Sequence, residues 1–463
     1  MLALQLGELT ADLPAGVAEA LDVVAGFDHA LIDGLARLDA GTADATRVLA
    51  ATVTGSPLGA SAAAAVASLG TTAPTPEELA ALCGARAALL GAIHDALLGR
   101  VDTVTGRERL PWPEESFSAA PDSTVAACRS WLQELAITGW RGIDHDLVAA
   151  ADQAIEALFA LPDRRRLAFL LDGFAAELRA CAPIATLPHL PVRRWADLWS
   201  RAMLLTWRGP DRPPAMDTAT VSGRLFIIGV DMQEHGTAVQ AQVYAVLEPA
   251  DATAARRVRI SVSAPKVDTV VGPAVWQLLT AHQHLRTALA EHRSLELVDM
   301  PLLAGGDLLW DDARAEVGEP ADPFATARVQ LPGALAAAVS PLDRDPVHIA
   351  EPVLIEGYRI IEDRLELDGA AIAVNADRLP SSGPLDAAAV RGSVACIGLL
   401  RWDDGRWSLR PLAVQRKVKG KVVEVHGGDW ACGPTDPKVV KAQAKSGDAV
   451  AVLRERAGRL LRT

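Results

Sequence analysis

Residues 208–214 read Arg-Gly-Pro-Asp-Arg-Pro-Pro, and the spacing of the apolar residues differs on the two sides of this stretch. Proline lacks the backbone N–H that helices and sheets use, so a polar segment rich in proline is typical of a domain boundary. Before it, apolar side chains recur every three or four residues, as on an amphipathic helix. After it, they alternate with polar side chains, as on a half-buried strand. The sequence therefore predicts an α+β protein, with a bundle-like helical half followed by a mainly antiparallel β half.

The helical half is defined by its caps and by its apolar stripes. The clearest helix start is TPEE at residues 75–78, where Thr75 is a favoured N-cap and Glu78 completes a capping box around Pro76. We expect this helix to end at Gly99, because glycine is common just past a helix end. A proline-containing stretch at 106–121 subdivides the helical half.

The second half carries the alternation of a β-sheet. Apolar and polar side chains alternate over residues 239–247 and 257–262. Together with residues 225–230, these segments predict a three-stranded antiparallel meander. A helix over residues 273–292 is expected to interrupt the strands.

The strongest local prediction is a hairpin built on Asp404-Gly405. Both residues tolerate the positive φ angles of a two-residue type I′ turn. With that turn, Trp402 faces Trp407 on the neighbouring strand, and such an aromatic pair stabilises a sheet.

These patterns predict four consecutive parts of the chain. A helical domain over 1–207 is followed by a linker at 208–217 and a β-rich domain over 218–435. A basic C-terminal helical segment over 436–463 closes the chain, its helix beginning at Asp436-Pro437.

Charge is distributed unevenly along the chain. The net charge is −13, yet residues 415–463 hold eleven Lys or Arg against five Asp or Glu. Six of the seven lysines lie in this C-terminal stretch, whereas arginine supplies the positive charge elsewhere. We expect the basic end to bind an acidic surface, either of a partner protein or of the acidic body of this chain.

A basic interaction patch follows from this distribution. Three lysines recur at three- and four-residue steps, which places them on one helix face, and no aromatic residue is interleaved with them. Binding of a nucleic-acid backbone is therefore an alternative to protein binding, but a weaker one. Three consecutive arginines at a helix start are a second candidate for contact with an acidic partner. Pairing with acids elsewhere in the chain's own body is the alternative for these arginines. The candidate patch residues are Lys417, Lys419, Lys421, Lys438, Lys441 and Lys445, with Arg164, Arg165 and Arg166.

The most distinctive segment is a glycine-rich loop at residues 426–433. It combines an imidazole, a carboxylate and a thiol with glycines that permit close approach of a ligand. A functional loop and a structural turn leading into the last helix are both consistent with it. The candidate loop residues are His426, Gly427, Gly428, Asp429, Trp430 and Cys432.

The sequence contains no established catalytic, phosphate-binding or metal-binding motif. Its five cysteines are far apart and form no CxxC pair, which argues against a disulfide framework or a structural zinc site. His284 and His292 lie two helical turns apart, about 12 Å along the axis, too far to share an ion. We therefore expect no cofactor and no metal.

These observations favour a non-catalytic scaffold or adaptor subunit of a cytoplasmic multiprotein assembly. The alanine and arginine bias is typical of a high-GC bacterial genome, and no signal peptide or membrane-spanning run is expected. Protein partners are thus more plausible than nucleic acid, and no membrane partner is expected. The first alternative is an enzyme of unfamiliar class with the 426–433 loop at its site. The second is a nucleic-acid-associated protein that uses its basic C-terminus.

Overall fold

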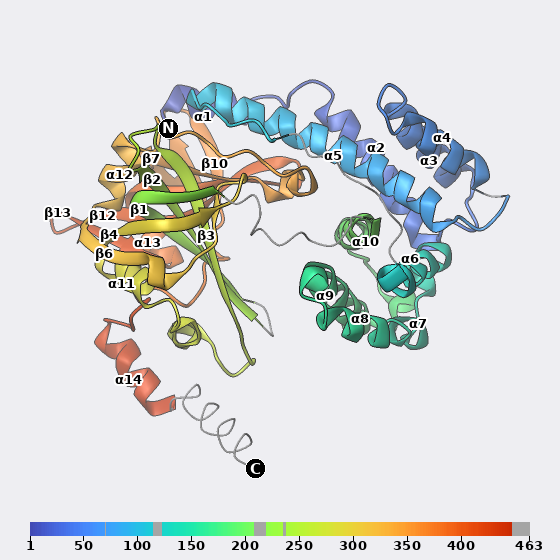
Figure 1. Cartoon of the computed structure of the whole chain (residues 1–463). Helices are drawn as coiled ribbons and strands as arrows, with labels where there is room; N and C mark the ends of the chain where they lie inside the picture. Colours follow the sequence, from blue (N-terminus) through green and yellow to red (C-terminus); the bar gives the residue numbers. More distant parts are fainter. Residues whose placement is uncertain (70, 114–122, 208–218, 235–237, 447–463) are drawn as a thin grey trace, which may run out of the picture.

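The computed structural model describes residues 1–463 except 70, 114–122, 208–218, 235–237 and 447–463. For residues 162 and 442–446 it describes the backbone alone. The first half is helical and the second half is mostly antiparallel sheet, as the change of apolar spacing predicts (Figure 1). The expected linker at 208–217 lies outside the described residues.

The helical half consists of α-helices joined by short 3₁₀ turns. Its α-helices are α1 (Ala3–Thr10), α2 (Val17–Asp33), α3 (Ala40–Thr52), α4 (Gly59–Ser68), α5 (Pro76–Thr105), α6 (Ala126–Thr138), α7 (His145–Ala149), α8 (Asp152–Phe159), α9 (Arg165–Cys181) and α10 (Val192–Trp207). Its 3₁₀ turns are η1 (Ser123–Val125), η2 (Trp140–Gly142), η3 (Pro162–Arg164) and η4 (Ile184–Thr186).

Helix α5 connects the two halves of the molecule (Figure 1). The predicted capping box is present, because Thr75 accepts from the backbone of Glu78 and the Glu78 carboxylate accepts from the backbone of Thr75. The predicted end at Gly99 is wrong, since the helix continues to Thr105 and is capped by Gly106 in the left-handed region. Val101 is fully buried beyond Gly99, so tertiary packing outweighs the low helix propensity of glycine.

A buried ion cluster fastens α5 to its neighbours. The Arg86 guanidinium donates to both carboxylate oxygens of Asp28 on α2, at 2.6 and 2.9 Å. It also donates to Asp197 and Ser200 on α10, at 2.5 and 3.2 Å. A fully buried guanidinium is tolerated because each of its partners accepts a hydrogen bond.

By length and composition, α5 is apolar enough to cross a membrane, and 56% of its most apolar 18-residue window is buried inside the protein. Buried core helices of soluble proteins share this length and composition, so α5 is weak evidence for a membrane span.

The β half begins with a closed ring of strands. Strand β1 pairs with both β2 and β4, and the order β1-β2-β3-β5-β4 returns to β1, with β6 added on the outer side of β4. The β1–β2–β3 meander confirms the prediction from the alternating residues. The strands are β1 (Ala219–Glu234), β2 (Ala238–Pro249), β3 (Arg256–Pro265), β4 (Arg293–Leu302), β5 (Asp307–Leu308) and β6 (Ala315–Pro320).

A second sheet repeats this order of connections when β7 and β8 are counted together as its first strand. Its order is β7-β11-β12-β10-β9-β8, and only two residues separate β7 from β8 along the chain, so the sheet curls back on itself. With that count, the third strand of each sheet runs parallel to the fifth, β3 to β5 and β10 to β12. The strands are β7 (Ala350–Glu356), β8 (Arg359–Ile361), β9 (Arg364–Leu367), β10 (Ala370–Val374), β11 (Ser393–Asp403), β12 (Arg406–Val418) and β13 (Lys421–His426).

Helices occupy equivalent positions in the two sheets, between the third and fourth strands. The expected helix over 273–292 is divided into a 3₁₀ segment and a shorter α-helix. The predicted C-terminal helix begins at Pro437, and its part at 447–463 lies outside the described residues. The remaining helical segments are η6 (Gly272–Leu279), α11 (Gln283–Glu291), η7 (Asp312–Arg314), α12 (Pro323–Val329), η8 (Pro341–Asp343), η9 (Pro346–His348), α13 (Ala387–Arg391) and α14 (Pro437–Ser446).

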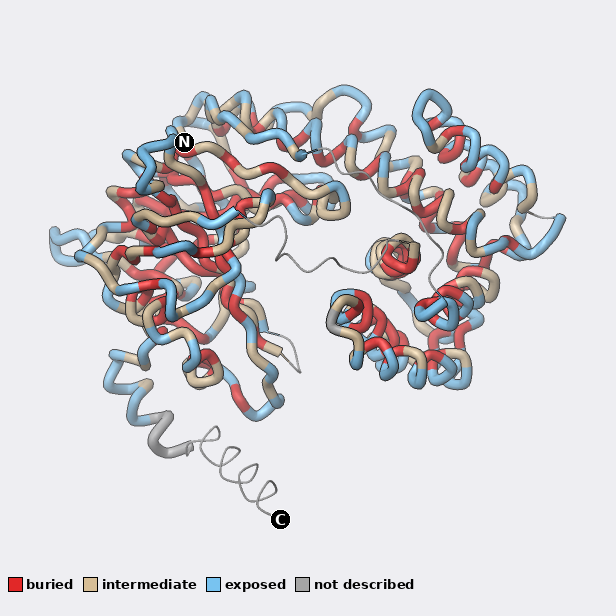
Figure 2. Tube along the Cα trace, viewed as in Figure 1, coloured by how far each residue is buried: buried red, intermediate tan, exposed pale blue. Residues whose placement is uncertain are grey.

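Many described residues are buried (Figure 2), and the apolar ones among them form three cores. One fills the first ring of strands, around Trp276. A second lies between the two sheets and includes Ile228, Phe324 and Ile397. The largest core joins the helical half to the second sheet, because residues such as Leu6 and Leu365 belong to the same cluster. The second sheet is therefore packed between the helices and the first sheet.

The predicted hairpin on Asp404-Gly405 is confirmed. Both residues have positive φ, at 50° and 72°, and Trp402 pairs with Trp407 in the register expected. The two indole rings lie 5.2 Å apart between centroids in an edge-to-face arrangement.

Candidate metal centre

The glycine-rich loop follows strand β13, which is the outer partner of β12 in the second sheet. His426 is the last residue of β13 and pairs with Ala413 of β12. Its side chain is 5% exposed, because it faces the first sheet and packs edge-on against Phe324 of α12. The fold thus brings the first residue of the loop to the junction between the two sheets.

His426 is hydrogen-bonded to a carboxylate on its own strand. Its Nε2 lies 3.1 Å from Glu424 Oε2, and the other oxygen of Glu424 accepts from Gln415 on β12 at 2.8 Å. Residues 424 and 426 share one face because side chains alternate along a strand. The bond to His426 lowers the pKa of Glu424, so this carboxylate is readily ionised.

A second histidine reaches the same place from the first sheet. His292 follows the last turn of α11 in the left-handed conformation, with φ at 51°. Its Nε2 lies 2.8 Å from Oδ1 of Asp429 in the glycine-rich loop. This hydrogen bond raises the pKa of His292, against the opposing effect of burial.

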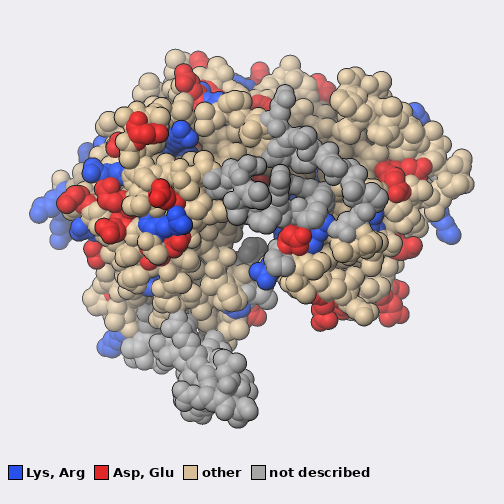
Figure 3. All heavy atoms as spheres, viewed as in Figure 1, with Lys and Arg blue, Asp and Glu red and all other residues tan. Residues whose placement is uncertain are grey.

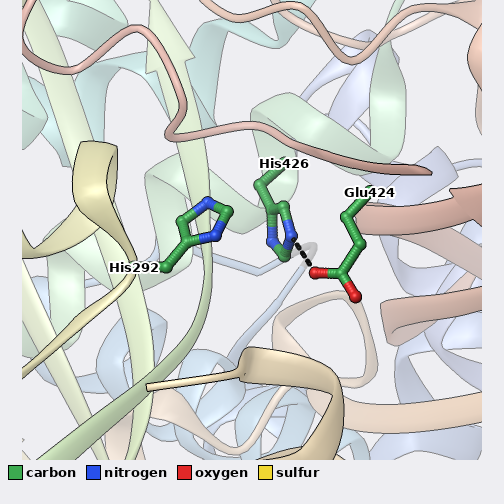
Figure 4. A group of neighbouring side chains, drawn as sticks. All are labelled: His292, Glu424 and His426. Atoms are coloured by element: carbon green, nitrogen blue, oxygen red, sulfur yellow. Dashed lines mark hydrogen bonds and ion pairs between the residues drawn. The ribbon is translucent and has the colours of Figure 1, made fainter. Parts of the chain in front are cut away.

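The two imidazoles and Glu424 form a group that can hold a metal ion (Figure 4). The ring centroids of His292 and His426 are 4.2 Å apart, and the candidate ligand atoms of all three side chains lie within 4.8 Å of one another. Ligand bonds of about 2.0–2.1 Å in a tetrahedral site separate the ligand atoms by about 3.3–3.5 Å. The most widely separated ligand atoms therefore need to approach each other by at most about 1.5 Å.

A small cavity lies against the two histidines. It has a volume of about 20 Å³ and is bordered by Gly229 and Val230 of β1 and by Ala288 and Leu289 of α11. A single water molecule needs a volume of this order. The cavity therefore has room for an ion-bound water beside the rings, and not for an organic substrate.

The glycines of the loop allow close packing against the first sheet. A Cβ atom on Gly428 would lie 3.1 Å from Leu289 and 3.2 Å from Val230, and one on Gly427 would lie 3.2 Å from the carbonyl oxygen of Val230. Their role in the structure is thus to let the loop approach β1 and α11. Trp430 is half-buried, and the exposed Cys432 lies near Thr287, so neither belongs to the group of ligands.

The lysines of the predicted patch occupy two separate elements. Lys417, Lys419 and Lys421 surround the turn between β12 and β13, where Lys419 and Gly420 have positive φ. All three are exposed, and blue side chains gather at this left edge of the molecule (Figure 3). None of them forms an ion pair with another residue that the structure describes.

The other lysines of the patch belong to α14. Lys438 and Lys441 are exposed, and the side chain of Lys445 lies outside the described residues. In Figure 1, α14 extends below the sheets, whereas α1 and α5 lie above them.

The three arginines at the start of α9 lie apart from these lysines. Arg164 is buried, with 4% of its surface exposed, and Arg165 is exposed. Arg166 is ion-paired with Asp343 of η8 at 3.1 Å. Arg166 thus pairs with an acid of the chain's own body, which is one of the alternatives that the sequence leaves open.

The role of His292 could not be found from the sequence. Residue spacing relates His292 only to His284 at the other end of α11, which is too far along the axis to share an ion with it. Its partners His426 and Glu424 come from a strand of the other sheet, and no spacing rule relates them. The only signal in the sequence is the unusual composition of residues 424–429, in which two acids flank a histidine and two glycines.

In comparisons with known proteins, no family model, no curated protein and no solved structure matches this chain.

Proposed function

We propose that this protein is a scaffold that binds a divalent transition-metal ion through His292, Glu424 and His426. The observation that supports the proposal is the convergence of two imidazoles and a carboxylate from separate sheets within 4.8 Å. Imidazole nitrogen with one carboxylate suits Zn²⁺ and its neighbours in the transition series, whereas Ca²⁺ and Mg²⁺ prefer sites made of oxygen alone. Zn²⁺ is therefore the first ion to test.

The ion's role in this proposal is structural. His292 directly precedes β4 of the first sheet, and Glu424 and His426 belong to β13 of the second, so a bound ion would link the two sheets across their junction. Binding free energy then adds to the stability of the folded state. The cavity of about 20 Å³ beside the rings leaves room for a coordinated water but not for a substrate.

The scaffold role rests on the hairpin that carries two of the ligands. Strand β13 holds Glu424 and His426 near one end and Lys421 at the other, where it meets β12. Val422 and Val418 are 57% and 40% exposed beside the lysines, a mixture of apolar and cationic groups suited to an acidic protein surface. A metal ion at the base of β13 would hold this docking hairpin in place.

Metal binding is tested with the full chain after treatment with a chelator. We expect calorimetric titration with Zn²⁺ to show one tight site, and Zn²⁺ to raise the melting temperature. His292→Asn and Glu424→Gln should each weaken binding at least tenfold. Asparagine is chosen at position 292 because it tolerates the left-handed backbone found there.

The matched control is His284→Asn on the same helix α11. His284 is 44% exposed and lies next to Asp312, outside the group of ligands. This variant should bind Zn²⁺ like the parent. Equal Zn²⁺ affinity in the parent, His292→Asn and Glu424→Gln would rule out this site.

A further inference from the structure

A larger cavity lies where the helical half meets the β half, away from the candidate metal centre. Its volume is about 480 Å³, which lies within the range of about 300–1,000 Å³ that is typical of small-molecule sites. Leu331, Val353 and Leu354 form part of its apolar wall. Arg107, just after α5, and Arg257, on β3, supply cationic groups at the same wall.

Three guanidiniums converge behind this wall on a single carboxylate. Glu351 of β7 accepts from Arg107 at 2.9 Å and from Arg109 at 3.1 Å, and its Oε2 lies 3.8 Å from Arg257 Nη1. Asp102 accepts from Arg109 at 2.7 and 2.9 Å. This network of three cations and two anions therefore carries one uncompensated positive charge.

Arg257 is the least satisfied member of the network. Its side chain is 7% exposed, and its one hydrogen bond runs from Nη2 to the carbonyl oxygen of Leu331 at 2.7 Å. Nε and Nη1 have no hydrogen-bond partner among the described residues. Burial, followed by the charge of Arg107, lowers the pKa of Arg257 to about 9. A buried cation with two free donors is unfavourable unless an anion completes its environment.

The rim of the cavity carries a further arginine. Arg328 of α12 is half-exposed and is ion-paired with Glu356 of β7 at 2.8 Å, so this pair is neutral as a whole. Asp368, an exposed carboxylate, also borders the cavity, so the excess positive charge lies at the inner wall, beside the apolar residues. This arrangement suits a ligand with an anionic end directed inward and an apolar body.

We propose that this cavity binds a small organic anion, an oxyanion on an apolar body, and that Arg257 and Arg107 recognise the oxyanion. The two free nitrogens of Arg257 are covered by the surrounding chain, so binding in this proposal requires its guanidinium to turn toward the cavity. Guanidinium groups bind carboxylates and phosphates alike through paired N–H donors. Both groups present an oxyanion to the guanidinium. The probes in the following experiment distinguish a carboxylate ligand from a phosphate ligand.

The test uses four probes with the full chain: benzoate, phenyl phosphate, benzamide and inorganic phosphate. Benzamide keeps the ring but has no charge, and inorganic phosphate keeps the charge but has no apolar body. We expect benzoate or phenyl phosphate to bind at least tenfold more tightly than benzamide and inorganic phosphate in calorimetric titration. The tighter of the two identifies the oxyanion. Failure of both to bind, or equal binding of benzamide, overturns the proposal.

Two variants assign the binding to this cavity. Arg257→Met keeps an unbranched apolar stem but removes the guanidinium and its charge. It should weaken binding of the preferred probe about tenfold or more, the loss expected for one charged hydrogen-bonding partner. Arg328→Gln, at the half-exposed rim, should weaken it a few-fold and keeps the test decisive if Arg257→Met does not fold. Arg224→Gln is the control, because Arg224 is an exposed partner of Glu296 in the first sheet. Binding that is unchanged in both cavity variants also overturns the proposal.

Discussion

His292 Nε2 lies 2.8 Å from Asp429 Oδ1, although 137 residues separate the two along the chain. The second oxygen of Asp429 accepts from the backbone N–H of His426 at 3.0 Å. One carboxylate thus contacts the ring of His292 and the backbone of His426. Toward His292 it resembles the outer partners that orient metal-binding imidazoles.

Replacing this carboxylate should weaken metal binding without removing a ligand. We expect Asp429→Asn to lower Zn²⁺ affinity about 10–100-fold, the usual cost of losing an outer partner of a ligating histidine. Titration calorimetry on the chelator-treated protein measures the change. Asp404→Asn, in the exposed turn between β11 and β12, is the control. An affinity equal to that of the parent would show that Asp429 does not orient His292.

The exposed lysines of the β12–β13 turn should govern association with an acidic partner. We expect the triple variant of Lys417, Lys419 and Lys421 to glutamate to lose partners in a pull-down from the native host at low salt. The difference should shrink as salt rises, because exposed charges are screened. If nucleic acid is the partner, the log–log salt slope should instead fall by roughly three units.

A matched charge reversal separates this effect from net charge. Arg359, Arg364 and Arg378 are exposed on or near β8, β9 and β10, and their reversal to glutamate changes the net charge by the same amount. This control variant should retain the partners. Equal loss in both triple variants would attribute association to overall charge rather than to the hairpin.

The stability contribution of Glu351 should depend on pH. Burial raises the pKa of Glu351, but Arg109, Arg107 and Arg257 outweigh it and lower the pKa to about 2. A carboxyl whose pKa is depressed in the folded state stabilises the protein at any pH above its unfolded-state pKa of about 4.3. This stabilisation is lost as the pH falls through the folded-state pKa. Glu351→Gln should therefore cost about 3 kcal/mol at neutral pH, and roughly half of that at pH 3.

Urea denaturation of parent and variant at the two pH values checks this prediction. Glu366→Gln on β9 is the control, since Glu366 is exposed. A cost of Glu351→Gln that does not change between neutral pH and pH 3 would contradict the assigned ion pairs.

The turn at Asp404-Gly405 should tolerate asparagine and reject valine at its second position. Gly405 has φ at 72°, and a Cβ added there would meet no atom within 4 Å, so any cost comes from the backbone. We expect Gly405→Val to destabilise the protein by about 1–3 kcal/mol, and Gly405→Asn to change it little. Thermal denaturation measures both. Equal melting temperatures for the valine and asparagine variants would contradict the turn type.

Local chemistry explains the predictions that succeed. The capping box at residues 75–78 and the turn at residues 404–405 depend on side chains within four positions of one another. The change from helical to alternating apolar spacing likewise predicts the order of helices and strands. The helix end at Gly99 fails because Val101, buried by distant residues, extends the helix past a weak position.

The sequence determined the α-then-β order, the caps, the two-residue turn and the unusual loop at residues 426–433. Only the tertiary structure decided that two sheets share one order of connections, that His292 meets His426, and that three arginines converge on Glu351. Residue spacing sets distances within one helix or strand, because its geometry repeats regularly. Distances between elements depend on how whole apolar faces pack, and that packing is set by cores formed from residues far apart in the chain.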